Sequence, residues 1–235
     1  MMKERKKLGI LGGMVPEATE VFYKKITEGT VVSNDRDHLD ILIYSHASIP
    51  DRTECIICGK TDELWGILEE DVRMLKGCGC DYLAIPCNTC HFFAEKFNEL
   101  MDGNFINMIE ETAAYAERRR LSKVGIMATD GTVRNNMYGK AMEKHGIEVV
   151  YPTVEDQRKV MSIIYDEIKA GEKDDKHKFM EVAGNLKESG CEAIILACTE
   201  LSVFNNNYDL NSDYYIDALD VVTRACIEKC GGTAY

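Results

Sequence analysis

The amino-acid sequence predicts an α/β protein made of two similar domains, each with a mainly parallel sheet. Short apolar runs alternate with longer amphipathic segments along all 235 residues, which is typical of strands joined by helical crossovers. The chain also repeats a phrase: residues 79–89 read GCDYLAIPCNT and residues 190–200 read GCEAIILACTE. In each copy, an apolar run of the kind that forms a buried parallel strand ends at a cysteine.

A second internal match supports one duplication of the chain. Residues 7–14 read KLGILGGM and residues 123–130 read KVGIMATD, and each run leads into a helical pattern. These runs begin 116 positions apart (7 to 123), and Cys87 and Cys198, which end the repeated phrase, are 111 apart (87 to 198). Such similar offsets indicate one duplication with a small difference in loop length.

In the first half, short apolar runs predict strands and amphipathic segments predict helices. Pro16 favours a helix start, because proline fits the first helical turn. The segment from Pro50 to Lys60 is predicted to be a loop. The predicted strands are 8–12, 39–45, 81–86 and 104–107, and the predicted helices are 16–29, 61–77, 90–101 and 110–120.

The second half repeats this alternation. Its predicted strands are 123–128, 147–150, 192–197 and 214–217, and its predicted helices are 132–145, 156–170, 175–189 and 218–230. Because the second unit looks complete near residue 205, the closing helix is expected to return to the first domain. The predicted domains are therefore 1–110 plus 210–235, an N-terminal α/β domain completed by the C-terminal helix, and 111–209, a second α/β domain.

Composition and charge exclude several kinds of partner. The formal net charge is −12, so nucleic acid and anionic membranes are poor partners for the surface. An acidic small substrate would need a local cationic pocket. No apolar run approaches the ~20 residues of a membrane span, and the basic start runs straight into a strand. We therefore expect a cytoplasmic protein.

Ten cysteines are many for a chain without an export signal. We expect most of them to be reduced thiols that pack as small buried hydrophobes. Cys80 and Cys191 start equivalent strands, which favours packing over reaction. This interpretation covers Cys55, Cys58, Cys78, Cys80, Cys191, Cys226 and Cys230.

The segment that follows the first predicted strand, residues 12–19, is glycine-rich and leads into a helix. It lacks both the dinucleotide-binding glycine spacing and the lysine of a P-loop. The residues alone leave two interpretations open: a tight turn, or a close backbone approach to a small ligand.

Cys87, Cys90 and His91 also match the Cys-x-x-Cys-His pattern of c-type haem attachment. A redox Cys-x-x-Cys pair is a further alternative, whereas the cysteine spacing does not suit a zinc site. Neither the haem nor the redox interpretation explains why Cys198 stands in the same context without such a partner. No metal-ligand spacing links the five histidines.

A third interpretation uses Cys87 and Cys198 together as acid and base. Inverting a Cα centre needs a base on one face and an acid on the other, and a thiolate and a thiol can exchange these roles. The polar residues after each cysteine would favour the thiolate and hold a carboxylate.

Two cations could bind an acidic substrate. Arg52 would lie on a loop at a strand end, where its guanidinium could clamp a carboxylate. The alternative is a surface ion pair with Asp51 or Glu54. Lys169 lies before a glycine at a predicted helix end, where lysine is also common simply because of the helix dipole.

Four segments in order closely resemble the cofactor-independent aspartate/glutamate racemase family, and within it the aspartate racemases. The resemblance covers nearly the whole chain. Its segments are residues 11–19, LGGMVPEAT; 49–53, IPDRT; 86–91, PCNTCH; and 198–201, CTEL.

The resemblance implies two three-layer domains related by a pseudo-twofold axis, with the active site in the cleft between them. It implies Cys87 and Cys198 as the proton donor and acceptor, Cys87 for the D-enantiomer and Cys198 for the L-enantiomer. It also implies a homodimer, with no pyridoxal phosphate, metal or nucleotide cofactor. The substrate-binding residues that it implies are Met14, Arg52, Asn88, Thr89, Thr129, Thr199 and Lys169.

Within this family, the pair of Arg52 and Lys169 is typical of members that act on acidic amino acids. The chain departs from the family pattern at Val15, Cys90, Ala197 and residues 46–48, which leaves the preferred substrate open. We expect a racemase that interconverts L- and D-aspartate, with glutamate as an open second substrate. The alternatives are a related dicarboxylate isomerase or decarboxylase, a Cys-x-x-Cys thiol oxidoreductase, and a non-catalytic binder of acidic amino acids.

Overall fold

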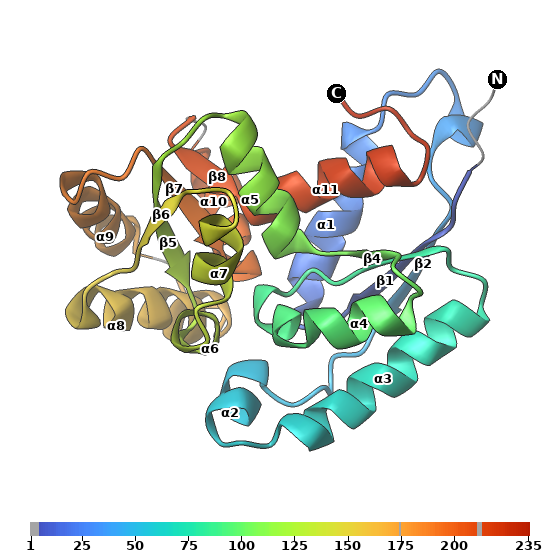
Figure 1. Ribbon diagram of the computed structural model, residues 1–235, viewed down its shortest axis with the longest axis horizontal. Helices are drawn as coiled ribbons and strands as arrows, with labels where there is room; N and C mark the ends of the chain where they lie inside the picture. The colour runs from blue at the N-terminus through green and yellow to red at the C-terminus, as the bar shows by residue number, and fades with distance from the viewer. Residues whose placement is uncertain (1–4, 174, 211–212) are drawn as a thin grey trace. The chain divides into compact units, whose positions relative to one another are not determined.

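The structure is a computed structural model that describes residues 5–173, 175–210 and 213–235. Within these residues the strands form two four-stranded sheets, and every strand pair within them is parallel (Figure 1). The first sheet has the order β2-β1-β3-β4 and the second has the order β6-β5-β7-β8. The predicted α/β class is confirmed. The strands are β1 (Leu8–Gly12), β2 (Ile41–Ser45), β3 (Tyr82–Ala84), β4 (Phe105–Ile106), β5 (Lys123–Ala128), β6 (Glu148–Val150), β7 (Ala193–Ala197) and β8 (Tyr215–Asp217).

Helices cover both faces of each sheet. In the first sheet, α3 and α4 lie on one side and α1 with α11 on the other; in the second, α8 and α9 lie opposite α5 and α7 (Figure 1). The α-helices are α1 (Pro16–Gly29), α2 (Arg52–Ile57), α3 (Thr61–Gly77), α4 (Ala94–Leu100), α5 (Met108–Arg118), α6 (Asp130–Arg134), α7 (Met137–Glu143), α8 (Val154–Ser162), α9 (Lys176–Glu188), α10 (Thr199–Tyr208) and α11 (Ala218–Lys229). Two short 3-10 helices, η1 (Asp35–Asp37) and η2 (Asn88–Phe93), and a π-helix, η3 (Ile163–Ile168), complete the described helices.

Backbone contacts divide the chain into two compact units, Met1–Met108 with Leu219–Tyr235, and Ile109–Ala218. The second junction follows β8, because β8 pairs with β7. We infer that these units are the domains, with this junction after β8 rather than at residue 210.

The predicted loop from Pro50 to Lys60 is wrong in part, because it contains α2. Asp51 caps this helix: its Oδ1 accepts the backbone N–H of Glu54 at 2.9 Å. An acidic cap three residues before a glutamate is a helix-start signal, and the spacing was present in the sequence. Arg52 is therefore the first residue of a helix rather than part of a strand-end loop.

Three predicted helices are each divided, and besides α2 one further α-helix was not predicted. The helix predicted at 132–145 breaks at Asn136, whose φ of 50° is left-handed. The helix predicted at 156–170 ends in η3, and the one predicted at 90–101 begins with η2. The unpredicted helix α10 starts directly after Cys198.

All ten cysteines are thiols, with no disulfide among the described residues. Cys58 and Cys78 are exposed, so for these two the expectation of burial is wrong; the other five of that group are buried. Burial raises the pKa of both Cys80 and Cys191, as suits packing thiols. No described helix combines the length and the apolar character needed to cross a membrane.

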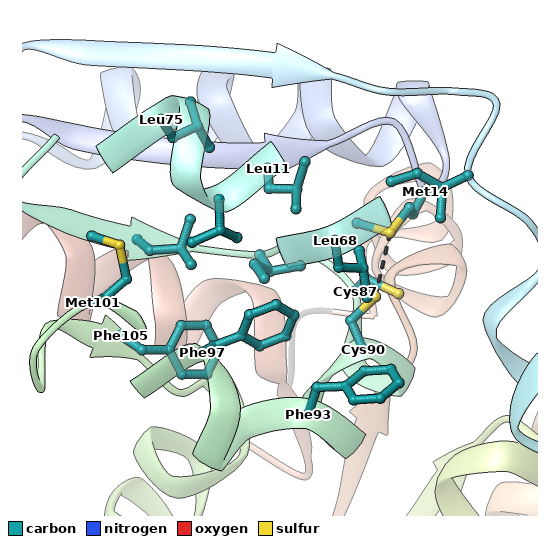
Figure 2. Close-up of a cluster of buried hydrophobic side chains, with 14 of the residues drawn as sticks. Leu11, Met14, Leu68, Leu75, Cys87, Cys90, Phe93, Phe97, Met101 and Phe105 are labelled. Carbon is teal, nitrogen blue, oxygen red and sulfur yellow. Dashed lines mark hydrogen bonds between the residues drawn. The ribbon is translucent and has the colours of Figure 1, made fainter. Parts of the chain in front are cut away.

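Each unit has a buried cluster that reaches a cysteine of the repeated phrase. The first cluster includes Met14, Cys87 and Cys90, which lie together at one edge of it (Figure 2). The second includes Cys198. The thiols therefore lie where apolar packing limits contact with water.

Candidate active site

The strand order sets where each unit can hold a ligand. In the first sheet the chain moves from β1 to β2 on one side and to β3 on the other, so the order reverses between β1 and β3. Open α/β sheets bind ligands beyond the carboxyl ends of the strands at such a point. Here β1 leads to Met14 and β3 leads to Cys87; in the second sheet β5 leads to Thr129 and β7 to Cys198.

Cys87 and Cys198 have matching backbone conformations. Each is the residue before a helix, with φ and ψ of −156° and 103° at Cys87 and −151° and 137° at Cys198. Both side chains are buried, and 5% and 6% of these residues, respectively, is exposed. The duplicated phrase therefore produces two equivalent thiol positions.

The glycine-rich segment after β1 is a tight turn held by close packing. Gly13 has a φ of 90°, and a Cβ there would lie 2.4 Å from the carbonyl carbon of His46. The Thr19 hydroxyl accepts the Gly13 N–H at 2.9 Å, and a Cβ on Gly12 would collide with the Thr19 side chain. Gly13 thus lets the turn pack against the backbone that follows β2, and Gly12 lets it pack against Thr19.

Arg52 is buried, with 8% of the residue exposed, so a surface ion pair does not describe it. Its Nη1 donates to the carbonyls of Ile49 and Pro50 at 3.3 and 3.2 Å, and its Nη2 donates to the Met14 carbonyl at 3.4 Å. Its Nε is buried and has no hydrogen-bond partner among the described residues. The guanidinium therefore ties the turn after β1 to the segment before α2.

Arg52 also faces the cysteines of the first unit. Burial opposes its charge, but attraction to the negative forms of Cys87 and Asp51 outweighs burial and raises the pKa of Arg52. The interaction is mutual, so the guanidinium stabilises the thiolate form of Cys87.

Cys90 is fully buried beside Cys87. Its Sγ donates to the Sδ of Met14 at 3.3 Å (Figure 2). Burial, and then a hydrogen bond and charge repulsion from Cys87, raise the pKa of Cys90 well above its ordinary value. Cys90 is therefore the neutral thiol of this pair.

His91 is a neutral structural residue. Its Nε2 accepts the backbone N–H of Met108 at 3.0 Å, so Nδ1 carries the proton and donates to the Cys87 carbonyl at 2.9 Å. Burial lowers the pKa of His91 to about 4. Because both ring nitrogens are occupied, His91 does not suit the role of a haem-iron ligand.

In the second unit, Cys198 has a carboxylate partner. Its Sγ donates to the Oε2 of Glu200 at 2.8 Å, and the Thr199 hydroxyl donates to the same oxygen at 3.3 Å. Glu200 is buried, with 3% exposed. Glu200 is a site residue that the sequence reasoning missed. Its position two residues after Cys198, in a helix that begins at Thr199, was the available signal.

Lys169 reaches the same carboxylate. It directly follows η3, and its Nζ lies 3.6 Å from the Oε1 of Glu200 and 3.8 Å from the centre of the Tyr165 ring. Lys169 is thus more than a helix-end cation. A π-turn adds one residue to the helical repeat, which turns the end of the helix and is frequent at functional sites.

The remaining predicted site residues are buried in the same two groups. Asn88 and Thr89 follow Cys87 in η2, and the Thr129 hydroxyl accepts from the Thr132 N–H as the cap of α6. The first unit thus groups Met14, Arg52, Cys87, Asn88 and Thr89; the second contains Thr129, Lys169, Cys198 and Thr199. Among the described residues, no three side chains of His, Cys, Asp or Glu are grouped so that they could hold a metal ion.

The chain thus has two parallel sheets, each with a buried thiol just beyond the carboxyl end of an inner strand. These features define a class of duplicated α/β proteins with two equivalent cysteine sites. The family model for Asp/Glu/Hydantoin racemase matches residues 11–226, so the chain belongs to that family.

Individual solved structures and one curated protein resemble the chain. The aspartate racemase of Picrophilus torridus is 28% identical, with a TM-score of 0.82 over 98% of this chain and 96% of that one. The aspartate racemase homologue PH1733 of Pyrococcus horikoshii is 26% identical, with a TM-score of 0.76 over 96% and 99%. The broad specificity amino-acid racemase RacX of Bacillus subtilis is 28% identical over 148 residues, and this match spans 61% of this chain and 63% of that relative.

Proposed function

We propose that this protein is an amino-acid racemase that interconverts L- and D-aspartate by proton transfer between Cys87 and Cys198, with glutamate as an open second substrate. The observation that carries the proposal is the equivalence of these two buried thiols, each placed after an inner strand of its own parallel sheet. Family membership and the similarity to an aspartate racemase support it.

The proposed reaction uses one cysteine as the base and the other as the acid on the same Cα. One cysteine thiolate removes the α-proton, which breaks the Cα–H bond and forms an S–H bond. The other cysteine then gives its thiol proton to the opposite face. Polar groups after each cysteine, Asn88, Thr89 and Thr199, would hold the α-carboxylate while the carbanion forms.

Arg52 and Lys169 would bind the two carboxylates of a dicarboxylic substrate. Within the part of the chain that the structure describes, the buried Nε–H of Arg52 has no hydrogen-bond partner, so it would serve as a donor for such a carboxylate. Lys169 would exchange or share its contact with Glu200 when substrate binds. Met14 and Thr129 would line the site at the ends of β1 and β5. We further propose a homodimer that needs no added cofactor.

The test is α-proton exchange in deuterated water, followed by NMR, with aspartate, glutamate and alanine. We expect exchange of both aspartate enantiomers, and loss of racemisation in Cys87→Ala and Cys198→Ala. Cys80→Ala and Cys191→Ala are matched controls, because these cysteines lie just before the same two strands, β3 and β7, and we expect both variants to keep nearly full activity. Full-rate inversion of L-aspartate by Cys198→Ala would disprove the two-cysteine mechanism. Rapid alanine turnover would argue against a second cationic anchor.

A thiol oxidoreductase remains the second candidate, favoured by the contact between Cys87 and Cys90. A dicarboxylate isomerase or decarboxylase would not need the α-ammonium group of its substrate, so a panel of dicarboxylates with and without that group separates it from the racemase. Tight binding of aspartate without proton exchange would identify a non-catalytic binder.

A further inference from the structure

The two thiols have partners of opposite charge. In the first unit the Arg52 guanidinium attracts the thiolate form of Cys87, and in the second the Glu200 carboxylate accepts a hydrogen bond from the Cys198 thiol at 2.8 Å. A cation beside a thiol favours the thiolate, whereas an anion that accepts its hydrogen bond favours the protonated form. Two sites that are alike in backbone are therefore unlike in electrostatics.

Both oxygens of the Glu200 carboxylate have close partners. Two donors, the Cys198 thiol and the Thr199 hydroxyl, point to Oε2, and the Lys169 ammonium lies 3.6 Å from Oε1. Lys169 approaches Oε1, whereas the Cys198 thiol contacts the other carboxylate oxygen, Oε2, directly.

Further titratable groups lie near the two thiols. Beside Cys198, burial raises the pKa of Tyr138, which keeps the phenol neutral, and Asp217 adds negative charge near that phenol. Beside Cys87, Cys90 is a neutral thiol, and the acidic Asp51 lies near Arg52. Among the contacts described for the two thiols, Arg52 is the cation beside Cys87 and Glu200 is the anion beside Cys198.

We propose that Glu200 is a positioning residue that keeps the proton on Cys198, so that the resting protein carries Cys87 as the thiolate and Cys198 as the thiol. The consequence of this inference for catalysis rests on the proposed racemase function. The substrate enantiomer whose Cα–H faces Cys87 would react first: its proton goes to Cys87, and the thiol proton of Cys198 goes to the opposite face of Cα. One turnover would leave Cys87 as the thiol and Cys198 as the thiolate, ready for the reverse reaction.

The test measures the alkylation of each cysteine by iodoacetamide across pH, without substrate, and assigns the sites by tandem mass spectrometry. In the wild type, Cys87 should reach half-maximal rate at a lower pH than Cys198. In Glu200→Gln, the half-maximal pH of Cys198 should fall by about 1 unit or more, a roughly tenfold faster reaction near neutral pH. Arg52→Met should shift Cys87 in the opposite direction. Cys191 serves as an internal reference, and Glu155→Gln, at an exposed ion pair on α8, is the matched control.

An unchanged Cys198 profile in Glu200→Gln, or a wild-type Cys198 that titrates below Cys87, would overturn the proposal. Thermal unfolding checks that the variant folds. If Glu200→Gln does not fold, two other variants test the proposal. Glu200→Asp keeps the charge. Lys169→Met leaves the carboxylate without its cation and should raise the half-maximal pH of Cys198. Because this experiment measures no turnover, its outcome is independent of the proposed function. Cys87 can react at a lower pH than Cys198 even if the protein fails to racemise aspartate, and racemisation can be found even if this alkylation order is not.

Discussion

The Nε2 atom of His91 accepts the backbone N–H of Met108, the first residue of α5, at 3.0 Å. The opposite ring nitrogen donates to the Cys87 carbonyl at 2.9 Å. One neutral imidazole thus links the backbone of Cys87, a candidate catalytic residue, to the start of α5. Protonating this buried ring would place a charge away from water and would break its hydrogen bond with the Met108 N–H.

We expect His91 to make the protein sensitive to mild acid. Its folded pKa of about 4 lies below the ordinary 6.5, so the unfolded chain binds the proton first. The stabilisation is complete above about pH 6.5 and is lost as pH falls toward 4, about 2 kcal/mol of it between pH 7.5 and 5. Urea unfolding at these two pH values checks this. His91→Gln should be roughly 1–3 kcal/mol less stable than the wild type at pH 7.5. Its free energy of unfolding should then fall less than that of the wild type between pH 7.5 and pH 5. An identical pH dependence in both proteins would contradict the assignment.

Arg52→Lys should lower α-proton exchange about 100-fold or more, even though it keeps the positive charge. A lysine ammonium lacks the planar fork that reaches the carbonyls of Met14, Ile49 and Pro50 and also contacts Cys87. Arg52→Met should be slower still, because the charge is lost as well. Initial exchange rates of both aspartate enantiomers provide the measurement, with Arg73→Lys at an exposed pair as control. Near wild-type exchange in Arg52→Lys would show that charge alone suffices.

Gly13→Ala should destabilise the first unit by several kcal/mol. A Cβ there would lie 2.4–2.6 Å from three backbone atoms of His46, and its φ of 90° is also strained for alanine. Gly59→Ala is a matched control, since Gly59 also has a positive φ but no atom within 4 Å of its added Cβ. It should cost only about 1 kcal/mol. Equal losses in free energy of unfolding for the two variants would mean that backbone strain, and not contact with His46, requires the glycine.

Cys90→Ala separates the racemase from the thiol oxidoreductase. It removes the hydrogen bond to the Met14 sulfur and leaves a small cavity, which should cost about 1 kcal/mol. Racemisation should stay within a few fold of the wild type, because Cys87 and Arg52 remain. Insulin reduction that is present in the wild type and vanishes in Cys90→Ala would instead favour the oxidoreductase.

The sequence was sufficient for the framework of the fold. Four elements were predicted at the observed bounds: the strands at 8–12 and 123–128 and the helices at 16–29 and 61–77. Their signals, continuous apolar runs for the strands and a regular apolar period for the helices, lie within the segments themselves. The helix at Arg52 was missed although its Asp51 cap was readable. The breaks at Asn136 and at η3 were not predicted, since tertiary packing overrides helical periodicity there.

The sequence by itself determined two equivalent cysteines at the ends of equivalent strands, because a duplicated phrase produces the same local backbone twice. Only the tertiary structure decided what surrounds each thiol. The contacts of Arg52 with Cys87 and of Lys169 with Glu200 join residues about 30 or more positions apart, and side-chain charge acts through space rather than along the chain. For that reason a repeated sequence gives one thiol a cation and the other an anion.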